Sequence, residues 1–466
     1  MASVLWAFFA AALGCLLVFD FWDFAFLKPR WAAALVVFGV GTSLGIGITS
    51  CLFFLVNLAI PGILNMSMWF EVLLLAWAGY VAYRRSKSPA AQLTTPRFPL
   101  NFLLMGSLVL AVAVVATALA GAWEANPHGN WDAWTIWNLR ARFLAAGGEL
   151  AHRTWSPMLL SHPEYPLLIS AFVGRCWAFG HSVSPAAAIA TSCLYLLALL
   201  AIVIGGVALL RSQSLGLLAG LALLGTPTLL HEVSALYADI PITCYFTAAL
   251  VLMLLNYPLL AGLCASMAAW TKDEGLLFLA LLFAATLVFQ RRHVFRIVAG
   301  AVPVTLLVLT FKALLSKDTP SILGNSVHGL LPKLEDLSRY GQVIGAFGNE
   351  LVGMSFGWYH PLLPVLVLVI VLRFDRQHRR DLLFCSAICG SLMLAYFATY
   401  IITPYDLVWH LQTSLGRLFV QLWPCFLLAI FVGLRTPESV ASVAIPVEVA
   451  PRLIKVRKKT KASARR

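Results

Sequence analysis

The run Val36–Ala59, VVFGVGTSLGIGITSCLFFLVNLA, decides the fold class, because its 24 residues include no charged side chain. A second run, Leu103–Ala120, has the same character over 18 residues. A helix needs about 20 apolar residues to cross the hydrocarbon of a bilayer, whereas a barrel strand needs about 10 and alternates polar with apolar residues. Since backbone groups in hydrocarbon must be hydrogen-bonded within the protein, these runs predict membrane-spanning helices.

The composition of the whole chain agrees with that prediction. Of its 466 residues, 61% are hydrophobic and 11% are charged, whereas soluble domains carry about 25% charged residues. A soluble chain this apolar could not cover its surface with polar groups. We therefore expect an all-α, polytopic integral membrane protein. Its nine cysteines lie mostly in apolar runs, where they read as small buried hydrophobic residues.

We expect about thirteen spans, some of them barely long enough to cross a bilayer. Their expected positions are 4–27, 32–59, 66–83, 99–121, 184–210, 215–231, 240–256, 258–271, 274–290, 296–316, 346–372, 382–402 and 416–434. The chain then divides into an N-terminal three-span segment with its cytoplasmic loop (1–98), a catalytic core (99–434) with a long external loop (122–183), and a basic cytoplasmic tail (435–466). The first apolar stretch lacks a basic leader and a small-residue cleavage site, so we expect it to be retained as a span.

The net charge of +13 is distributed as in membrane proteins. Eight Lys and Arg residues fall in the last fifteen positions, and eleven more gather in short loops: Arg84, Arg85, Lys87 and Arg97; Arg291, Arg292 and Arg296; Arg373, Arg376, Arg379 and Arg380. Threading the spans puts all these clusters on one side, as the positive-inside rule requires of a cytoplasmic face. We expect a multi-pass protein of the cytoplasmic (inner) membrane, if the source is bacterial, and no nucleic-acid partner.

The opposite, non-cytoplasmic face collects most other ionisable residues. They are Glu124, His128, Asp132, Arg140, Arg142, His162, Glu164, Glu232, Asp239, Lys272, Asp273, Glu274, Asp406, His410 and Arg417. Such residues at the ends of spans are costly unless they are paired or functional. The long external loop is also rich in Trp, which an interfacial aromatic belt explains only in part. We interpret Asp132–Leu144 as a short interfacial helix with Asp132 as its N-cap.

Four motifs on this face resemble those of GT-C glycosyltransferases, the multi-span enzymes that include protein O-mannosyltransferases and the lipid A aminoarabinose transferase. The first external loop carries NWDAWTIWNLRAR (130–142) and HPEYPLL (162–168). YADIP (237–241) resembles the family's second acidic element, and TKDEG (271–275) resembles its Thr-Lys-Gly element. DLVWHLQTSLGRL (406–418) resembles a late external loop with a basic residue. The resemblance spans about 99–434, although Ala133 stands where some members have a second carboxylate.

This resemblance implies an inverting glycosyltransferase that takes a sugar from a polyprenyl-phosphate carrier and acts on the non-cytoplasmic side. The acceptor would be a lipid, a glycan or a protein. The residues support that chemistry independently, because sugar transfer needs a base near the acceptor hydroxyl and cations near the departing phosphate. Asp132 is our candidate base. The candidates for binding the lipid phosphate and the substrate are Arg140, Lys272, Arg417, Asp239, His162, Tyr165, Trp134 and Trp137.

Each candidate also has a structural interpretation. Asp132 can serve only as a helix N-cap, and Asp239 can simply begin a helix that has Pro241 in its first turn. Lys272 can be an interfacial lysine whose ammonium reaches water, and Arg417 can pair with Asp406. His162 and Tyr165 fit a positioning role better than a catalytic one.

No cofactor is expected. The chain has neither a nucleotide-binding Gly-rich loop nor a recognisable metal-ligand spacing, although His128 and His410 together with Asp132 are the residues that a divalent metal would use. The alternative function is a transporter or flippase of lipid-linked saccharides, which commonly shows two similar halves with interrupted helices. A ligase or polymerase of lipid-linked glycans would share the chemistry, but it would concentrate arginines in a large external loop.

Overall fold

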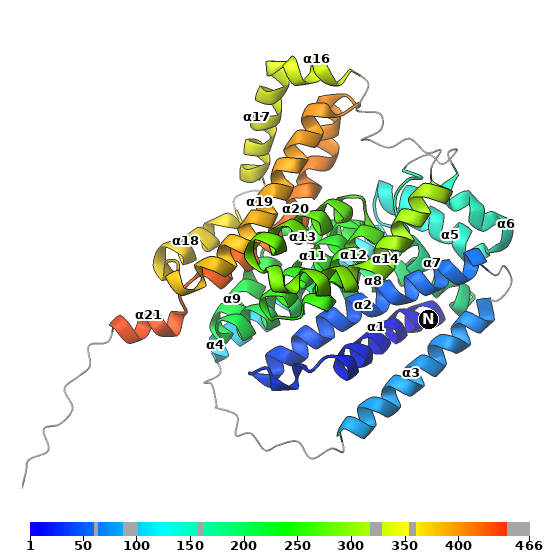
Figure 1. Cartoon of the computed structure of the whole chain (residues 1–466), viewed down its shortest axis with the longest axis horizontal. Coiled ribbons are helices and arrows are strands. Elements are labelled where there is room, and N and C mark those ends of the chain that lie inside the picture. Colours follow the sequence, from blue (N-terminus) through cyan, green and yellow to red (C-terminus); the bar gives the residue numbers. More distant parts are fainter. Residues whose placement is uncertain (60–63, 87–100, 157–161, 317–328, 354–359, 445–466) are drawn as a thin grey trace, which may run out of the picture.

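The computed structural model describes residues 1–59, 64–86, 101–156, 162–316, 329–353 and 360–444 (Figure 1). Within those residues the regular structure is helical, and the one β-type pairing is an isolated bridge between Phe374 and Leu434. The all-α class expected from the sequence is confirmed. Lys87 and Arg97 of the expected first basic loop, and most of the expected tail, lie outside the described residues.

The longer helices are α1 (Ala2–Phe21), α2 (Arg30–Ala59), α3 (Leu64–Ser86), α4 (Phe102–Ala125), α8 (Pro185–Leu210), α14 (Val294–Thr310), α17 (Leu337–Gly353), α19 (Arg379–Ile402) and α20 (Leu407–Gly433). The shorter ones are α5 (Asn138–Ala146), α6 (Gly148–Ala151), α7 (Leu168–Gly180), α9 (Gln213–Leu224), α10 (Pro227–Ala235), α11 (Asp239–Leu254), α12 (Pro258–Thr271), α13 (Glu274–Phe289), α16 (Leu330–Glu335), α18 (Leu362–Leu372) and α21 (Pro437–Ala444).

In this part of the chain, eight helices are long and apolar enough to cross a bilayer, and a ninth span is possible if α9 and α10, bent by 63°, count as one. The protein is therefore a multi-pass helical membrane protein. Three of the thirteen expected spans correspond to α11, α12 and α13, which are short apolar helices of 14 to 16 residues. The expected span 346–372 includes 354–359, which the structure does not describe. The full count of thirteen stays a prediction.

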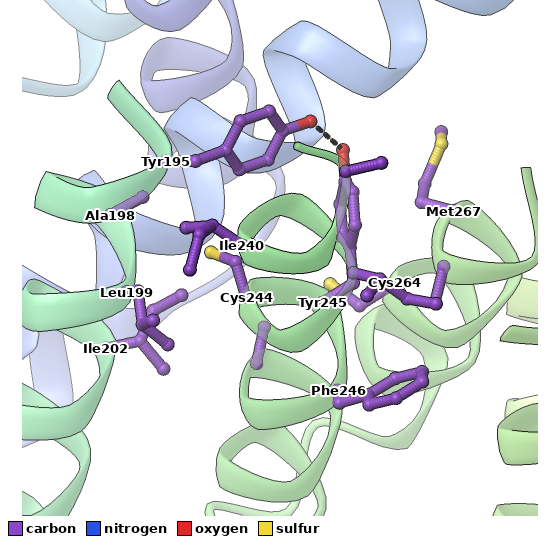
Figure 2. Packing of buried hydrophobic residues seen from close by; sticks show 14 of the residues in the cluster. Tyr195, Ala198, Leu199, Ile202, Ile240, Cys244, Tyr245, Phe246, Cys264 and Met267 are labelled. Carbon is purple, nitrogen blue, oxygen red and sulfur yellow. Dashed lines mark hydrogen bonds between the residues drawn. The ribbon is translucent and has the colours of Figure 1, made fainter. Parts of the chain in front are cut away.

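The centre of the molecule is built by α2, α8, α11, α12 and α20, and α3 lies at its edge beside α1 (Figure 1). Tyr195 of α8 and Tyr245 of α11 are fully buried there, with their hydroxyl oxygens 3.0 Å apart (Figure 2). The Tyr245 hydroxyl donates to the carbonyl of Ser43 in α2 at 2.6 Å. Because lipid tails are as apolar as the helices, such buried hydrogen bonds and close packing contribute to helix association.

Glycines allow α1 and α2 to cross closely. A Cβ atom built on Gly45 would lie 2.0 Å from the carbonyl oxygen of Ala10, and one on Gly14 would lie 2.0 Å from that of Gly41. These are backbone atoms, which cannot move aside as a flexible side chain would. Small residues at helix crossings are the usual means of close approach in membranes.

A buried ion pair connects α3 to the rest of the bundle. Glu71 of α3 and Arg175 of α7 have no exposed side-chain surface, and Arg175 Nε donates to Glu71 Oε1 at 2.9 Å. Arg175 also donates to the carbonyl of Trp6, whose ring lies under the guanidinium. The sequence analysis missed this pair. The sequence does contain one acidic and one basic residue in apolar segments, and such charges are costly in a bilayer unless they form an ion pair.

The glycine crossing yields a stability prediction. Gly45→Ala should lower the free energy of unfolding by about 1–3 kcal/mol, because overpacking forces the two helix backbones apart. Gly106→Ala is the matched control, since no atom lies within 4 Å of the position its Cβ would take. Thermal unfolding of both variants in the same detergent, followed by size-exclusion chromatography, should show a lower Tm for Gly45→Ala alone. Equal Tm values would contradict the crossing.

Candidate active site

Four residues that the sequence analysis selected meet in one ion network. They are Asp132 at the start of the helical segment in the long loop, Asp239 at the first position of α11, Lys272 between α12 and α13, and Arg417 in α20. Segments up to 285 positions apart in sequence are joined by these contacts. The structure therefore brings together the candidate base and two of the three candidate cations.

Arg417 is the centre of the network. Its Nη1 donates to Asp132 Oδ2 at 2.6 Å, while its Nη2 and Nε donate to Asp239 Oδ2 at 2.8 and 3.1 Å. A third carboxylate, that of Glu232 in α10, lies 4.0 Å from Nε. The guanidinium also lies 4.4 Å from the ring centroid of Tyr237, as in a cation–π interaction. The planar guanidinium fork thus links three separate elements, which a single ammonium could not do with the same geometry.

Asp239 is the buried anchor of the network. Its carboxylate is completely buried and accepts from Lys272 Nζ at 3.0 Å and from Gln421 Nε2 at 2.6 Å, besides Arg417. Gln421 follows Arg417 by four residues, so one face of α20 supplies both donors. The Gln421 amide oxygen accepts from the hydroxyl of Tyr396 at 2.8 Å, which fixes the amide's orientation. The sequence analysis missed Gln421, although a polar residue one turn from Arg417 in an apolar run was its signal.

Local sequence explains how each side chain reaches the site. Asp239 begins α11, with Pro241 in the first turn as expected. Lys272 has extended backbone because α12 ends at Thr271, and the next helix begins at Glu274. The Glu274 carboxylate lies 3.0 Å from Lys272 Nζ, so this break holds a cation between two acids.

The network is sealed on one side and open on the other. Asp239 has no exposed side-chain surface and Lys272 only 5%, whereas Asp132 and Arg417 each expose 18%. Taking a carboxylate and its cations out of water is favourable only when they are paired, as they are here. The reachable half of the site is therefore the Asp132 carboxylate with the Arg417 fork beside it.

Asp132 does not act as the expected N-cap. Its carboxylate makes no capping hydrogen bond, and the backbone after it forms a π-helical turn, η2 (Ala133–Trp137), that continues into α5. The carboxylate binds Arg417 instead, because a bond between two ionised groups is stronger than one to a neutral backbone amide. The helix itself is confirmed, but its position at the membrane interface stays a prediction.

Two other structural interpretations are also wrong. Arg417 does not pair with Asp406, whose carboxylate caps α20 by accepting from the Trp409 amide at 2.8 Å. Lys272 does not reach for water, because its ammonium is held by Asp239 and Glu274 in a buried position. For Arg417, carboxylates from distant segments replace the local partner that the sequence suggested; for Lys272, the distant Asp239 and the neighbouring Glu274 replace water.

Arg140, the third candidate cation, does not join the network. Its side chain is completely buried, and burial lowers its pKa to about 9. Its guanidinium donates to the backbone carbonyls of Thr154, His162, Pro163 and Tyr165. Because these bonds use the guanidinium to shape the loop, we do not retain Arg140 as a phosphate ligand.

An aromatic stack supports the same loop. The Tyr165 ring stacks on His162 at 4.3 Å and on Trp137 at 5.9 Å between centroids. Burial raises the pKa of Tyr165 well above its ordinary value, and the nearby Glu274 carboxylate acts in the same direction. His162 Nδ1 lies 3.0 Å from the Glu164 carboxylate. These contacts suit the positioning role expected for His162 and Tyr165, and they place Trp137 in the same packing.

A second ion pair, which the sequence analysis missed, joins this loop to the break between α12 and α13. Lys312, in the turn η5 (Phe311–Leu315), has its Nζ 2.7 Å from Asp273 Oδ1 and donates to the backbone carbonyl of Glu164 at 3.2 Å. Lys312 sits at the end of an expected span, and one lysine there is the usual interfacial signal. Only the fold shows that it lies next to the candidate site.

The basic loop 373–380 lies at the C-terminal end of α20, where the Asp375 amide donates to the carbonyl of Gly433 at 2.7 Å. Arg211, which follows α8, donates through Nη2 to Asp375 at 2.8 Å and to the carbonyl of Leu434 at 2.6 Å. Arg417 and Gly433 are separated by about 24 Å along the helix at 1.5 Å per residue. The basic loop near Gly433 and the mixed-charge site around Arg417 are therefore far apart along α20.

Comparisons with protein-family models, with curated proteins and with solved structures returned no match to this chain. The resemblance to GT-C enzymes stays a prediction that rests on the four quoted motifs. Among the described residues, no group of three or more His, Cys, Asp or Glu side chains is arranged to hold a metal ion.

The burial gradient yields a second stability prediction. Asp239→Asn should destabilise the protein by about 3–5 kcal/mol, because it leaves two buried cations short of an anion. Asp132→Asn should cost less, since the Asp132 carboxylate is partly exposed to water. Glu149→Gln is the control, as Glu149 is exposed in the same loop. Thermal unfolding in detergent should rank the Tm values in that order, and an Asp239→Asn variant as stable as the control would contradict the anchor.

Proposed function

We propose that this protein is a membrane-embedded glycosyltransferase that moves a sugar from a polyprenyl-phosphate carrier to an acceptor hydroxyl. The observation that carries the proposal is the Asp132 carboxylate, which is reachable from outside and held against Arg417 over a buried anchor of opposite charges. Such an arrangement supplies a base, and a cation that can stabilise the negative charge developing on the leaving phosphate, within one pre-organised site. The order of the four motifs, which resemble GT-C enzymes, supports the same function.

In the proposed reaction Asp132 accepts the proton of the acceptor hydroxyl. The hydroxyl oxygen then bonds to the anomeric carbon from the face opposite the phosphate, so the configuration inverts. The bond between that carbon and the phosphate oxygen breaks, and its electron pair leaves with the lipid phosphate. Asp132 finally releases its proton to water.

Arg417 is the proposed partner of the departing phosphate, because it belongs to the reachable half of the site. A guanidinium has five N–H donors, so it can bind a phosphate oxygen while it keeps its carboxylate partners. Lys272 is buried with only 5% of its side chain exposed, and it supports the phosphate site through its charge and its bond to Asp239. Asp239 and Gln421 hold these cations in place without touching the substrate in this proposal, and they are positioning residues.

The sidedness of the reaction follows from the charge pattern. The basic loops near Arg211 and Asp375 lie at the opposite end of α20 from the site, and the positive-inside rule assigns basic loops to the cytoplasm. We therefore assign the site to the non-cytoplasmic side and the C-terminus to the cytoplasm. The polyprenyl chain would lie in lipid beside the helices, and the acceptor would be a lipid, a glycan or a protein.

One observation favours a second candidate function, transport of a lipid-linked saccharide. The helices α9 and α10 meet at a 63° bend, and broken helices often form substrate sites in transporters. Glu232 of α10 lies next to Arg417, so one helix of the bent pair contacts the ion network. A transporter would move its substrate without forming or breaking a covalent bond.

The activity test uses purified protein in proteoliposomes with polyprenyl-phosphate sugars labelled in the sugar, and with membrane extract as the acceptor source. Wild-type protein should transfer label from the carrier to a new product, and Asp132→Asn should lower the rate at least about 100-fold, as expected for loss of a general base. Glu149→Gln should transfer at the wild-type rate. All variants are compared at equal amounts of monodisperse protein.

Two results would overturn the proposal that the protein is a glycosyltransferase. One is full transfer by Asp132→Asn. The other is movement of the labelled lipid across the bilayer with no new product, which would establish the transporter instead.

A further inference from the structure

A cleft of about 520 Å³ opens on a different face of the loop helix from the one that carries Asp132. It lies between the C-terminal end of α4, the segment η2–α5, the end of α7 and the start of α8. Its lining includes Asn126, His128, Trp134, Asn138, Arg142 and Trp177. None of the residues of the ion network lines it, so the cleft is a separate site.

The helix presents one row of side chains to this cleft. Trp134, Asn138 and Arg142 follow one another at intervals of four residues, which places them on one face of a helix. Asp132 precedes Trp134 by two residues and therefore points to another face, toward Arg417. Trp134 was expected in the substrate site, but the structure places it in this cleft.

The charge of the cleft is one-sided. Its lining includes Arg142 and His128 but no carboxylate. Arg142 is exposed, and among the described residues its guanidinium has no hydrogen-bond or ion-pair partner. This differs from Arg417, Arg175 and Arg140, whose guanidinium groups each donate to several acceptors within the protein. An unpaired arginine in a concave, acid-free site fits an anionic ligand.

The remaining lining groups fit a sugar. Trp134 is 48% exposed, so much of its surface is open to a ligand. Asn138 offers an amide group that can both donate and accept hydrogen bonds with hydroxyls, whereas the Asn126 amide nitrogen already donates to Gly129 and Asn130 and leaves its oxygen as an acceptor. A volume of 520 Å³ lies within the range of about 300–1,000 Å³ that small-molecule sites occupy. An interfacial aromatic belt explains an exposed Trp, but not its place in an acid-free polar cleft.

We propose that this cleft binds a phosphorylated saccharide or polyol, with the ring against Trp134 and the phosphate on Arg142. The ligand chemistry is shared by soluble sugar phosphates and by inositol phospholipid headgroups, since the cleft lies at the ends of the spans α4 and α8. The proposal concerns binding and does not depend on sugar transfer, because no residue of the proposed reaction lines the cleft.

The test measures binding of radiolabelled glucose 1-phosphate to the full-length protein in phosphatidylcholine nanodiscs. Glucose 1-phosphate should bind at least about 10-fold more tightly than glucose, because a bidentate Arg–phosphate contact distinguishes them. Arg142→Gln should remove that difference, and Trp134→Ala should weaken binding of both sugars. Arg153→Gln, an exposed arginine in the same loop, and Trp69→Ala, an exposed tryptophan in α3, are the matched controls and should bind as the wild type does.

Nanodiscs that contain phosphatidylinositol separate the two sources of the ligand. If the headgroup occupies the cleft, these nanodiscs should lower glucose 1-phosphate binding in the wild-type protein, whereas unchanged binding supports a soluble sugar phosphate. Asp132→Asn should leave binding unaltered, so failure of the transfer assay and failure of this assay are distinguishable. Equal affinity for glucose and glucose 1-phosphate, no binding of either, or an Arg142→Gln variant that binds as the wild type does would overturn the proposal.

Discussion

The guanidinium of Arg417 is the interaction on which the site depends. It holds Asp132 of the long loop and Asp239 of α11 to α20. In a bilayer, helices gain little from burying apolar surface against each other, because lipid is equally apolar. A few charge-assisted contacts therefore decide how this loop sits on the bundle, and they also collect the reactive groups in one place.

The side chains of this network range from completely buried to partly exposed. The innermost acid, Asp239, is satisfied by Lys272, Gln421 and Arg417, so its charge is stabilised without water. The outer acid, Asp132, accepts a hydrogen bond from one guanidinium nitrogen of Arg417 and remains partly exposed. A sealed inner half holds the geometry rigid, while the open outer half can meet a substrate. This division between positioning and reacting groups is common to pre-organised catalytic sites.

The same physical rule explains the polar contacts away from the site. Glu71 with Arg175 holds α3 to α7, and Tyr195 with Tyr245 joins α8 to α11 in the centre. In each case two polar groups in apolar segments satisfy one another, since an unpaired group in hydrocarbon costs several kcal/mol. Arg142 lies outside this rule, because it is exposed in the cleft and needs no partner within the chain.

The sequence alone determined the membrane environment, the helical class and the segments that carry the candidate residues, because uninterrupted apolar length and isolated charges are local properties. It also selected Asp132, Asp239, Lys272 and Arg417. Only the tertiary structure decided their partners: it bound Asp132 to Arg417 instead of to a helix end, and it buried Arg140 among loop carbonyls. In the sequence, a charged residue at the end of a span looks the same whether it caps a helix, forms an ion pair or binds a ligand. The partner that distinguishes these roles comes from a segment far away along the chain.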